Sequence, residues 1–528
     1  MNKPNILLIF ADQMRFDAMG AMGNPIIKTP NLDRLAAQGA LYKNAITPAP
    51  LCTPARSCTI LGHNATKIGA YGNSEPIHYP AAQTLPRLLA PCGYFSQAIG
   101  KMHFGGPPHE VSHGMDHMIL SEEMRGLRTA DSVEEVVFDE YDQFLIDNKR
   151  WGWEKPTEIG YNEIKPTISP LEKEFHITQW CGDETVKWLK NDRPQGQPFF
   201  LWSSFVKPHV PYDCPRHLIG LYNEDDMPDA HVSELDGTHK NPFFADYIEK
   251  QEYNLYSKKA AKRALAHYYA NITFIDEQVG RILDTLEEEG LADNTLVLFS
   301  ADHGDMMGDH GLWYKSFGYE GSMHVPMIAR FPGVIAEGTI CENVTSLVDI
   351  YPTILAAGGA VDENAEARPG VSLIDIANGE ARETRELCIS EMFRGKNYVM
   401  HARFQKWKFL FHANGGFVEL YDLESDPYEM VDLAENADYA ETVASLKAQC
   451  EDYIAKYGDC ENLLDAQGHL VQFQFAQAKS SVFAPRPFSR MPWDYRFPPA
   501  EMTDSAKGWF WRDVDGDWAT IFKKMTKK

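Results

Sequence analysis

A nucleophilic side chain and a fixed cation occur close together in the stretch 51–62, LCTPARSCTILG. Proline is favoured at the first position of a helix and glycine just past its end, so Pro54 and Gly62 predict a short helix with Cys52 at its N-terminus. That end of a helix favours an anion. Arg56, one turn later, is a permanent positive charge that can lie beside Cys52. A buried structural thiol fits the same pattern, and this stretch alone does not decide between the two.

Polar side chains follow several short apolar runs, at the points where buried strands would end. The run 4–11 (PNILLIFA) shows no alternation of polar and apolar residues, as is typical of a parallel strand covered on both faces. Open α/β sheets bind ligands at the carboxyl ends of such strands. The polar residues at these ends are Asp12 and Gln13 after the first run, Lys101 and His103 after 94–99, His209 after 198–205, and Asp302, His303 and Lys315 after 295–299. The ordinary alternatives are a helix cap for Asp12 and a solvated loop for Lys101 or His103.

These side chains divide into metal ligands and cations. The expected ligands are Asp12, Gln13, Asp302 and His303. Such an oxygen-rich set suits a hard divalent cation, so we expect calcium first, with Mg²⁺ or Mn²⁺ as the alternatives. The groups expected around the same mouth are the cations Arg56, Lys101 and Lys315 and the imidazoles His103 and His209. A site of this kind could bind a tetrahedral oxyanion, neutralise its charge and move protons near neutral pH.

The elements that position these residues alternate between short strands and helices. This order predicts an α/β fold with a large, mainly parallel sheet sandwiched by helices. The helices are expected at 30–38, 85–89, 177–189, 258–289 and 347–356, and further strands at 40–45 and 325–331. Residues from about 118 to 175 have no persistent period, so we expect insertion loops over the site there.

The chain changes character near residue 385, so we expect three parts. Residues 1–384 would form the catalytic α/β domain. Residues 385–457 would form a smaller subdomain, an antiparallel meander over 387–392, 398–403, 407–412 and 419–422 with a turn at 414–416 and one helix over 439–457. Residues 458–528 are rich in aromatic side chains, too apolar for a disordered tail. We expect this extension to pack on the body or on a neighbouring subunit, which would make a homo-oligomer.

Composition restricts the class of partner. The chain has 528 residues, a formal net charge of -25 and nine scattered cysteines. The negative charge argues against nucleic acid or an anionic membrane as a partner. The cysteines form neither a disulfide framework nor a paired zinc motif. The sequence shows no apolar run of membrane-spanning length and no signal segment, so we expect a cytoplasmic protein.

Taken together, the motifs resemble those of the type I sulfatases, a branch of the alkaline-phosphatase superfamily. The resemblance covers about residues 4–457. The matching motifs are C-x-P-x-R at 52–56, N-x-x-x-x-x-x-D-Q at 5–13, G-K-x-H at 100–103, K-P-H-x-P at 207–211, D-H-G…G-D-H-G…K at 302–315, and the second-domain segment LYDLESDPYE at 420–429. Two features depart from the family: members are commonly exported, whereas this chain shows no signal, and the aromatic tail goes beyond the usual end of the fold.

The resemblance implies that a separate maturation enzyme oxidises Cys52 to formylglycine, which then also belongs to the metal site. One hydroxyl of its hydrate, polarised by the cation and Arg56, would attack sulfur in line and form a covalent sulfate hemiacetal. The second hydroxyl allows the sulfate to be expelled. The other implied roles are proton donation to the leaving oxygen by His209 and Lys315, binding of sulfate oxygens by Lys101 and Lys315, and proton removal from the second hydroxyl by His103.

The expected activity is therefore hydrolysis of a small sulfate monoester, a sulfated carbohydrate first and an aryl sulfate second. Hydrolysis of a phosphonate or phosphate monoester at the same metal and formylglycine site is the nearest alternative, although relatives of that kind tend to lack the pair formed by Lys101 and His103. A binding protein that keeps Cys52 unmodified is an alternative of another class. Mass spectrometry of the Cys52 peptide separates it from the enzyme.

Overall fold

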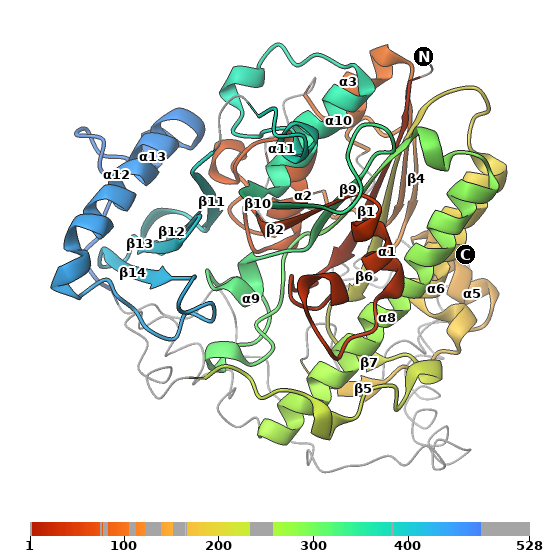
Figure 1. Ribbon diagram of the computed structural model, residues 1–528, viewed down its shortest axis with the longest axis horizontal. Coiled ribbons are helices and arrows are strands. Elements are labelled where there is room, and N and C mark those ends of the chain that lie inside the picture. The colour runs from red at the N-terminus through yellow and green to blue at the C-terminus, as the bar shows by residue number, and fades with distance from the viewer. Residues whose placement is uncertain are drawn as a thin grey trace, which may run out of the picture.

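A computed structural model describes residues 3–73, 77, 83–104, 112–122, 139–150, 164, 166–232, 257–381 and 385–476. Within these residues the central sheet has eight strands (Figure 1). Their order across the sheet is β10 (Thr339–Ser346), β2 (Ala40–Ile46), β9 (Met327–Arg330), β8 (Thr295–Ala301), β1 (Asn5–Asp12), β6 (Phe199–Pro208), β3 (Phe95–Gly100) and β4 (His117–Leu120). Strand β9 runs antiparallel to β2 and β8, and the other neighbours are parallel. The prediction of a mainly parallel sheet is confirmed.

Strand β1 lies at the centre of this sheet, between β6 and β8. All its residues are buried, as expected for an apolar run without alternation. Its carboxyl end and that of β8 are aligned, since Ala11 pairs with Ala301. The pairing with β6 shifts between Ala11 and Asp12. The polar residues that follow β1 and β8 therefore leave the sheet side by side.

Helices cover both faces of the sheet (Figure 1). On one face lie α1 (Pro30–Ala37), α6 (Ile177–Lys187) and α8 (Lys258–Glu288), and on the other lie α2 (Cys52–Leu61), α3 (Leu85–Leu89) and α10 (Ile350–Gly358). A single-turn 3-10 helix at Leu347–Asp349 precedes α10. The helices predicted from the sequence are all present, with ends that differ by a few residues.

Helix α2 begins two residues earlier than Pro54 predicts. Leu51 is its N-cap and Cys52 its first residue, so Pro54 stands third, still within the first turn where no helical N–H partner is needed. Gly62 ends the helix in the left-handed conformation, with φ of 66°. A Cβ atom at Gly62 would lie 2.6 Å from the ring of Tyr351. Both the backbone angle and the packing therefore require glycine there.

One expectation for the first domain is wrong in part, and one strand was not predicted. Residues from about 118 to 175 are not insertion loops alone, because they include β4 at the sheet edge and α5 (Glu140–Asp147), whose Tyr141 and Leu145 are buried in the main core. The short lengths of these elements hid their periodicity. Residues 123–138, 151–163 and 165 of this stretch lie outside the described residues. Strand β10 was also not expected. Its alternating exposed and buried residues suit an edge strand rather than the fully buried runs that mark the sheet centre.

The second sheet is an antiparallel meander, as predicted. Its strands are β11 (Leu387–Met392), β12 (Val399–Phe404), β13 (Trp407–His412) and β14 (Phe417–Asp422). The glycines of the turn at 414–416 have φ of 91° and 68°. Helix α12 (Ala440–Tyr457) packs on this sheet and forms a second hydrophobic core with it. The short α13 (Cys460–Leu463) and Leu470 join the same core, so the described part of the extension packs on the body.

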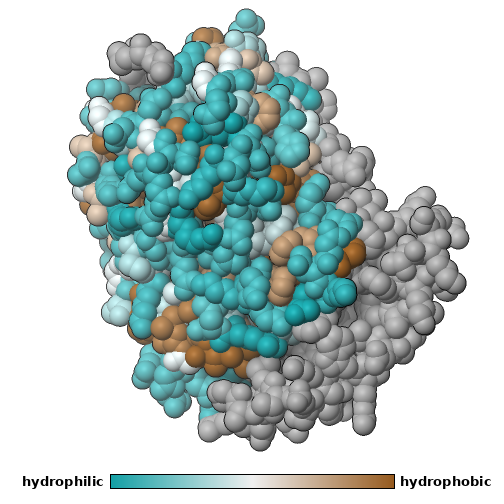
Figure 2. Space-filling model, turned by 90° about the vertical axis from the view of Figure 1, so that its right-hand side faces the viewer, coloured by the Kyte–Doolittle hydropathy of each residue, from teal (hydrophilic) through white to brown (hydrophobic). Residues whose placement is uncertain are grey.

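The division into three parts stays a prediction, and residues 477–528 of the extension lie outside the described residues. The face seen in Figure 2 is largely hydrophilic, with one larger group of hydrophobic residues near its lower edge and smaller groups elsewhere. Among the helices that the structure describes, none combines the length and apolarity needed to cross a membrane.

Candidate functional site

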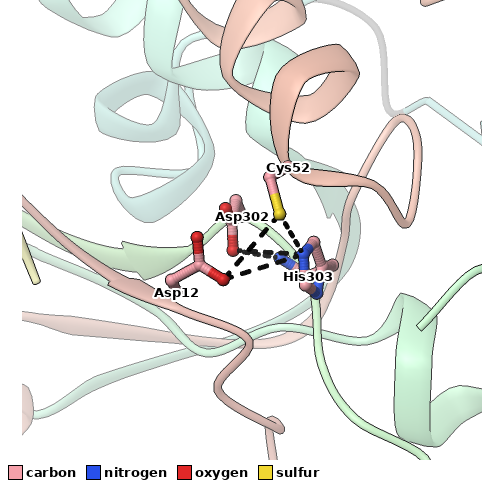
Figure 3. Close-up of side chains that lie close together, drawn as sticks. All are labelled: Asp12, Cys52, Asp302 and His303. Carbon is pink, nitrogen blue, oxygen red and sulfur yellow. Dashed lines mark hydrogen bonds and ion pairs between the residues drawn. The ribbon is translucent and has the colours of Figure 1, made fainter. Parts of the chain in front are cut away.

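Four side chains from three elements meet where β1 and β8 end (Figure 3). Asp12 is the last residue of β1, Asp302 and His303 follow β8, and Cys52 points at them from the N-terminus of α2. One ligand atom from each lies within 4.8 Å of the others. All four side chains are buried. The prediction that two strand ends and the Cys52 helix build one site is therefore consistent with their placement.

Lys101 and Arg56 pair with the Oδ2 atoms of the two carboxylates. Lys101 Nζ lies 2.6 Å from Asp12 Oδ2, and Arg56 places Nη2 3.2 Å from the same oxygen and Nε 2.8 Å from Asp302 Oδ2. Burial alone would raise the pKa of Asp12, but the charges of Lys101, His209, Lys315 and Arg56 hold it well below its usual value. Asp12 therefore stays a carboxylate at neutral pH.

Arg56 does not lie simply beside Cys52, as the sequence suggested. Its nitrogens donate to Asp12, to Asp302, to the carbonyl oxygen of Lys101 and, at 2.8 Å, to Ser204 Oγ. Asp12 ends β1, Lys101 and Asp302 directly follow β3 and β8, and Ser204 lies within β6, so Arg56 links four neighbouring strands of the sheet. Its main visible role is to orient the carboxylates.

His303 is held with one ring nitrogen facing the other ligands. Its Nδ1 lies 2.9 Å from the carbonyl oxygen of Gly304, which can only accept a hydrogen bond, so Nδ1 carries the hydrogen. The neutral ring then has its lone pair on Nε2, and Nε2 lies 3.2 Å from Cys52 Sγ. A histidine oriented in this way is suited to metal coordination.

Cys52 lies beside a further cation. Lys315 Nζ is 2.9 Å from its sulfur. Burial and the charge of Asp12 raise the pKa of the thiol, but Lys315, Lys101 and His303 lower it more, so the net pKa lies below its ordinary value. Of the two interpretations of the stretch 51–62, this environment favours a reactive Cys52 over an inert buried thiol.

Gln13 lies next to the ligands, in the left-handed conformation with φ of 68°. Its backbone N–H donates to Asp302 Oδ1, and its side-chain Nε2 donates to Asp305 Oδ2. Its Oε1 is buried and makes no hydrogen bond within the described residues. Its role as a metal ligand stays a prediction.

His103 lies in a turn after β3 and not in an extended continuation of that strand. Strand β3 ends at Gly100, and His103 has φ of 51°. Its backbone N–H donates to Glu122 Oε1 at 2.8 Å, and the N–H of Met102 donates to the same oxygen at 2.9 Å. The carboxylate of Glu122, just after the C-terminal end of β4, therefore shapes this turn, and no local sequence pattern marks this contact.

His209 lies in the loop after β6, and its charge contributes to the lowered pKa of Asp12. Its Nδ1 lies 2.8 Å from the carbonyl oxygen of Val210. Lys207 fixes the loop: its Nζ donates to the carbonyl oxygens of His209 and Pro211 and forms an ion pair with Asp213. Lys207 therefore stabilises the loop that carries His209.

Asp305 is a site residue that sequence reasoning missed. Its Oδ2 accepts hydrogen bonds from Gln13 Nε2 and from the Tyr212 hydroxyl at 2.7 Å. Its Oδ1 accepts from the backbone N–H groups of Met307 and Tyr314, at 3.0 and 3.1 Å. Asp305 thus joins the segments that carry Asp12, His209 and Lys315. Its position within the motif at 302–315 was the signal, but spacing alone does not reveal such long-range partners.

The donor set fits a divalent cation. Two buried carboxylates and one oriented imidazole nitrogen converge, and oxygen and nitrogen ligands of this kind are typical of divalent-cation sites. A hydrolytic centre could follow from this arrangement, because a nucleophile, a cation site and several cationic side chains face one small volume.

Comparison with known proteins agrees with this picture. A family model described as Sulfatase matches residues 4–360, and one described as N-sulphoglucosamine sulphohydrolase, C-terminal, matches residues 308–456. An arylsulfatase of Clostridium perfringens is 32% identical over 469 residues, covering 84% of this chain and 93% of its own. A choline-sulfatase of Rhizobium meliloti is 30% identical over 445 residues, covering 82% and 83%.

Solved structures share the fold. The phosphonate monoester hydrolase of Agrobacterium radiobacter superposes with a TM-score of 0.75 at 24% identity, covering 86% of this chain and 96% of its own. The protein BT4656, solved with D-glucosamine-2-N,6-O-disulfate, superposes with a TM-score of 0.67 at 22% identity, covering 87% and 99%. At these identities the likeness concerns the architecture of the sheet and its flanking helices, not the substrate.

Proposed function

The chain belongs to the sulfatase family, and on that basis we propose that it hydrolyses a sulfate monoester, with a sulfated carbohydrate as the first expected substrate and an aryl sulfate as the second. The observation that carries the proposal is the position of Cys52. It stands at a helix N-terminus, 2.9 Å from Lys315 Nζ and next to two buried carboxylates and His303. Relatives named N-acetylglucosamine-6-O-sulfatase and N-acetylgalactosamine-6-sulfatase support a carbohydrate substrate.

Asp12, Asp302 and His303 would hold the divalent cation, with Gln13 as a further proposed ligand. Calcium is the expected ion, and Mg²⁺ or Mn²⁺ are the alternatives, because carboxylate and amide oxygens dominate the set. Bound there, the cation would supply positive charge that polarises an oxygen of the ester. Arg56 and Lys101 hold the outer carboxylate oxygens, so the ligands are already oriented.

Conversion of Cys52 to formylglycine, by a maturation enzyme, would complete the nucleophile. The hydrate of that aldehyde would supply one hydroxyl for attack and a second from which a proton can leave. Conversion needs no new space, since it replaces sulfur by oxygen and removes two hydrogens.

The surrounding side chains have distinct proposed tasks. Lys315 and Lys101 would bind sulfate oxygens, and their position beside Cys52 and Asp12 supports this task. His209, or Lys315, would protonate the leaving oxygen. His103 would take a proton from the nucleophile's second hydroxyl. Arg56 would act as a positioning residue, since its nitrogens donate to the ligand carboxylates.

A substrate panel tests the proposal. Protein whose Cys52 conversion is proven by mass spectrometry is assayed with sulfated mono- and disaccharides, aryl sulfates and one phosphonate ester. We expect the highest kcat/KM for a sulfated sugar. A higher kcat/KM for the phosphonate ester would favour the alternative activity, hydrolysis of a phosphonate monoester. The Agrobacterium enzyme of that name shares the fold. Absence of turnover with every ester would contradict an enzymatic role.

Cys52→Ser tests the nucleophile. Serine has a single hydroxyl, so it can attack but offers no second hydroxyl to release sulfate. We expect either no activity or at most one turnover with a sulfated protein left behind, measured as a mass increase on intact protein. Normal multiple turnover by this variant would exclude the mechanism. Cys58→Ser, which changes a buried thiol of the same helix, is the matched control and should retain activity.

A further inference from the structure

Four potential ligand atoms converge at the site, and one of them is the sulfur of Cys52. Cys52 Sγ lies 3.2 Å from His303 Nε2 and 3.9 Å from Asp12 Oδ1, and His303 Nε2 lies 4.0 Å from Asp12 Oδ1 and 3.7 Å from Asp302 Oδ1. A regular tetrahedron with edges of this length has its centre about 2.0–2.4 Å from each corner, the range of Zn–N, Zn–O and Zn–S bonds. The unconverted site therefore has the size of a four-coordinate zinc site.

Outer partners orient each of the protein ligands. The Nδ1 hydrogen of His303 is taken by the Gly304 carbonyl, so Nε2 faces inward. Lys101 and Arg56 hold Asp12 Oδ2, and Arg56 holds Asp302 Oδ2, so that the Oδ1 atoms face Cys52 and His303. Asp302 Oδ1 also accepts the N–H of Gln13. Such outer contacts are the usual support of a tight metal site.

The chemistry of sulfur decides which ion this set prefers. Thiolate ligands favour zinc, whereas calcium and magnesium take oxygen ligands. We propose that the unconverted chain binds Zn²⁺ through Cys52, Asp12, Asp302 and His303, and that conversion of Cys52 removes the sulfur and changes the site to one for a hard cation. On binding, the S–H proton passes to solvent and a sulfur lone pair forms the Zn–S bond, without oxidation or reduction.

Only the second part of this inference, the change of metal preference when Cys52 is converted, rests on the proposed function. The first part concerns the chain with its cysteine intact. It implies that a folded, unconverted chain carries zinc and is inactive, so that a mixed preparation should contain zinc in proportion to its fraction of unconverted Cys52.

Lys315 competes with zinc for the same sulfur, because its Nζ lies 2.9 Å from Sγ. The structure thus also allows a metal-free form in which the lysine alone pairs with the thiolate. If the two cations compete, replacing Lys315 by methionine should tighten zinc binding.

Cobalt(II) titration is the direct test. Full-length protein with unconverted Cys52, verified by mass spectrometry, is stripped of metal and titrated with Co²⁺. A thiolate ligand gives an intense sulfur-to-cobalt charge-transfer band in the near ultraviolet, and Zn²⁺ should abolish it. We expect the band in this protein and in Cys58→Ser, and not in Cys52→Ser or in converted protein. Zinc affinity, measured by competition with a chelating dye, should fall at least about tenfold in Cys52→Ser.

The outcomes separate clearly. Absence of the band in unconverted protein, or its presence in Cys52→Ser, would overturn the proposal. If Cys52→Ser does not fold by circular dichroism, converted protein serves as the sulfur-free comparison. None of these measurements uses a substrate. A chain without sulfatase activity could still show the band, and an active sulfatase could lack it when unconverted, so this test and that of the proposed function fail independently.

Discussion

Arg56 shows how one buried side chain can hold several parts of a site together. It is fully buried and donates to acceptors on, or directly after, four neighbouring strands. Burial lowers the pKa of an arginine, but Asp302 and Asp12 raise that of Arg56 above its usual range, so it remains charged. A planar guanidinium can serve two carboxylates at once in fixed directions, whereas an ammonium group acts as a point charge.

Arg56→Lys should therefore lower kcat/KM on the order of 100-fold even though the charge is kept, because one ammonium cannot hold both Asp12 and Asp302 in place. Steady-state kinetics on the best ester of the panel measures this loss, and metal content measures the loss of ligand orientation. Arg34→Lys, at an exposed ion pair with Asp284, is the matched control and should behave as the parent protein. Full activity of Arg56→Lys would show that the charge alone suffices.

At the scale of elements, the loop after β8 is the part of the site that most needs support. It carries Asp302 at its start and Lys315 near its end, and Met307, His310 and Tyr314 within it all have positive φ. Such backbone angles are costly for residues other than glycine and persist only when other contacts fix them. The four hydrogen bonds to Asp305 are contacts of this kind.

Asp305→Asn keeps the volume of the side chain but leaves only one oxygen to accept the hydrogen bonds that two oxygens accept in the parent protein. We expect Lys315 to be less well placed, with kcat lowered on the order of tenfold and stability lowered by about 1–3 kcal/mol. Tyr212→Phe removes a single donor and should have a smaller effect in the same direction. A variant that loses stability while its folded fraction keeps the parental kcat would limit Asp305 to a structural role.

The strands at the centre of the sheet show how much of the site could be predicted from the sequence. Apolar runs marked β1, β6 and β8 because both faces are buried, and their carboxyl ends located Asp12, Asp302 and His303. Partners that approach from a distant part of the chain left no local signal. Asp305 and Glu122 act through backbone N–H groups and hydroxyls, and these interactions depend on the folded path of loops rather than on any periodicity.

The edges of the sheet were harder to predict than its centre. Strand β10 has exposed as well as buried positions, and β4 has only four residues, so neither contains enough apolar residues for a clear pattern. Helix α5, with eight residues, is also too short to show a clear pattern. The antiparallel meander, by contrast, was recognisable because its strands follow one another through tight turns.

At the scale of the whole molecule, a buried charge network joins the two cores. Lys408 of β13 is fully buried and pairs with Glu320 of α9 (Glu320–Met323) at 2.9 Å and with Glu429 at 2.8 Å. Glu320 also pairs with His324, whose other nitrogen reaches the carbonyl oxygen of Lys43 on β2. The second sheet is thereby connected through α9 to the sheet that carries the site.

Lys408→Met should destabilise the protein by about 3–5 kcal/mol, because it leaves two buried carboxylates without their shared cation. Denaturant unfolding followed by far-ultraviolet circular dichroism measures the change. Lys406→Met, which removes the cation of an exposed ion pair with Asp422, should destabilise the protein much less. Similar losses in the two variants would show that the network contributes nothing beyond a surface pair.

Buried neutral histidines should make the whole molecule sensitive to acid. His63 follows α2 directly, and burial, with the charges of Arg368 and Lys67, lowers its pKa to about 4. Its unfolded value is about 6.5, so between these values the unfolded chain binds more protons than the folded one, and the free energy of unfolding falls as the pH falls. His113, with a pKa lowered by burial to about 4, acts in the same direction.

From pH 7.5 to 5.5, His63 alone should therefore remove roughly 1 kcal/mol of stability, most of it below pH 6.5. His63→Asn, which cannot titrate there, should unfold with a free energy that depends less on pH, even if its stability at pH 7.5 differs from that of the parent. Denaturant unfolding at several pH values measures the slope. A parental slope in His63→Asn would mean that His63 is already protonated in the folded state, and that the turn after α2 tolerates a second charge beside Arg368.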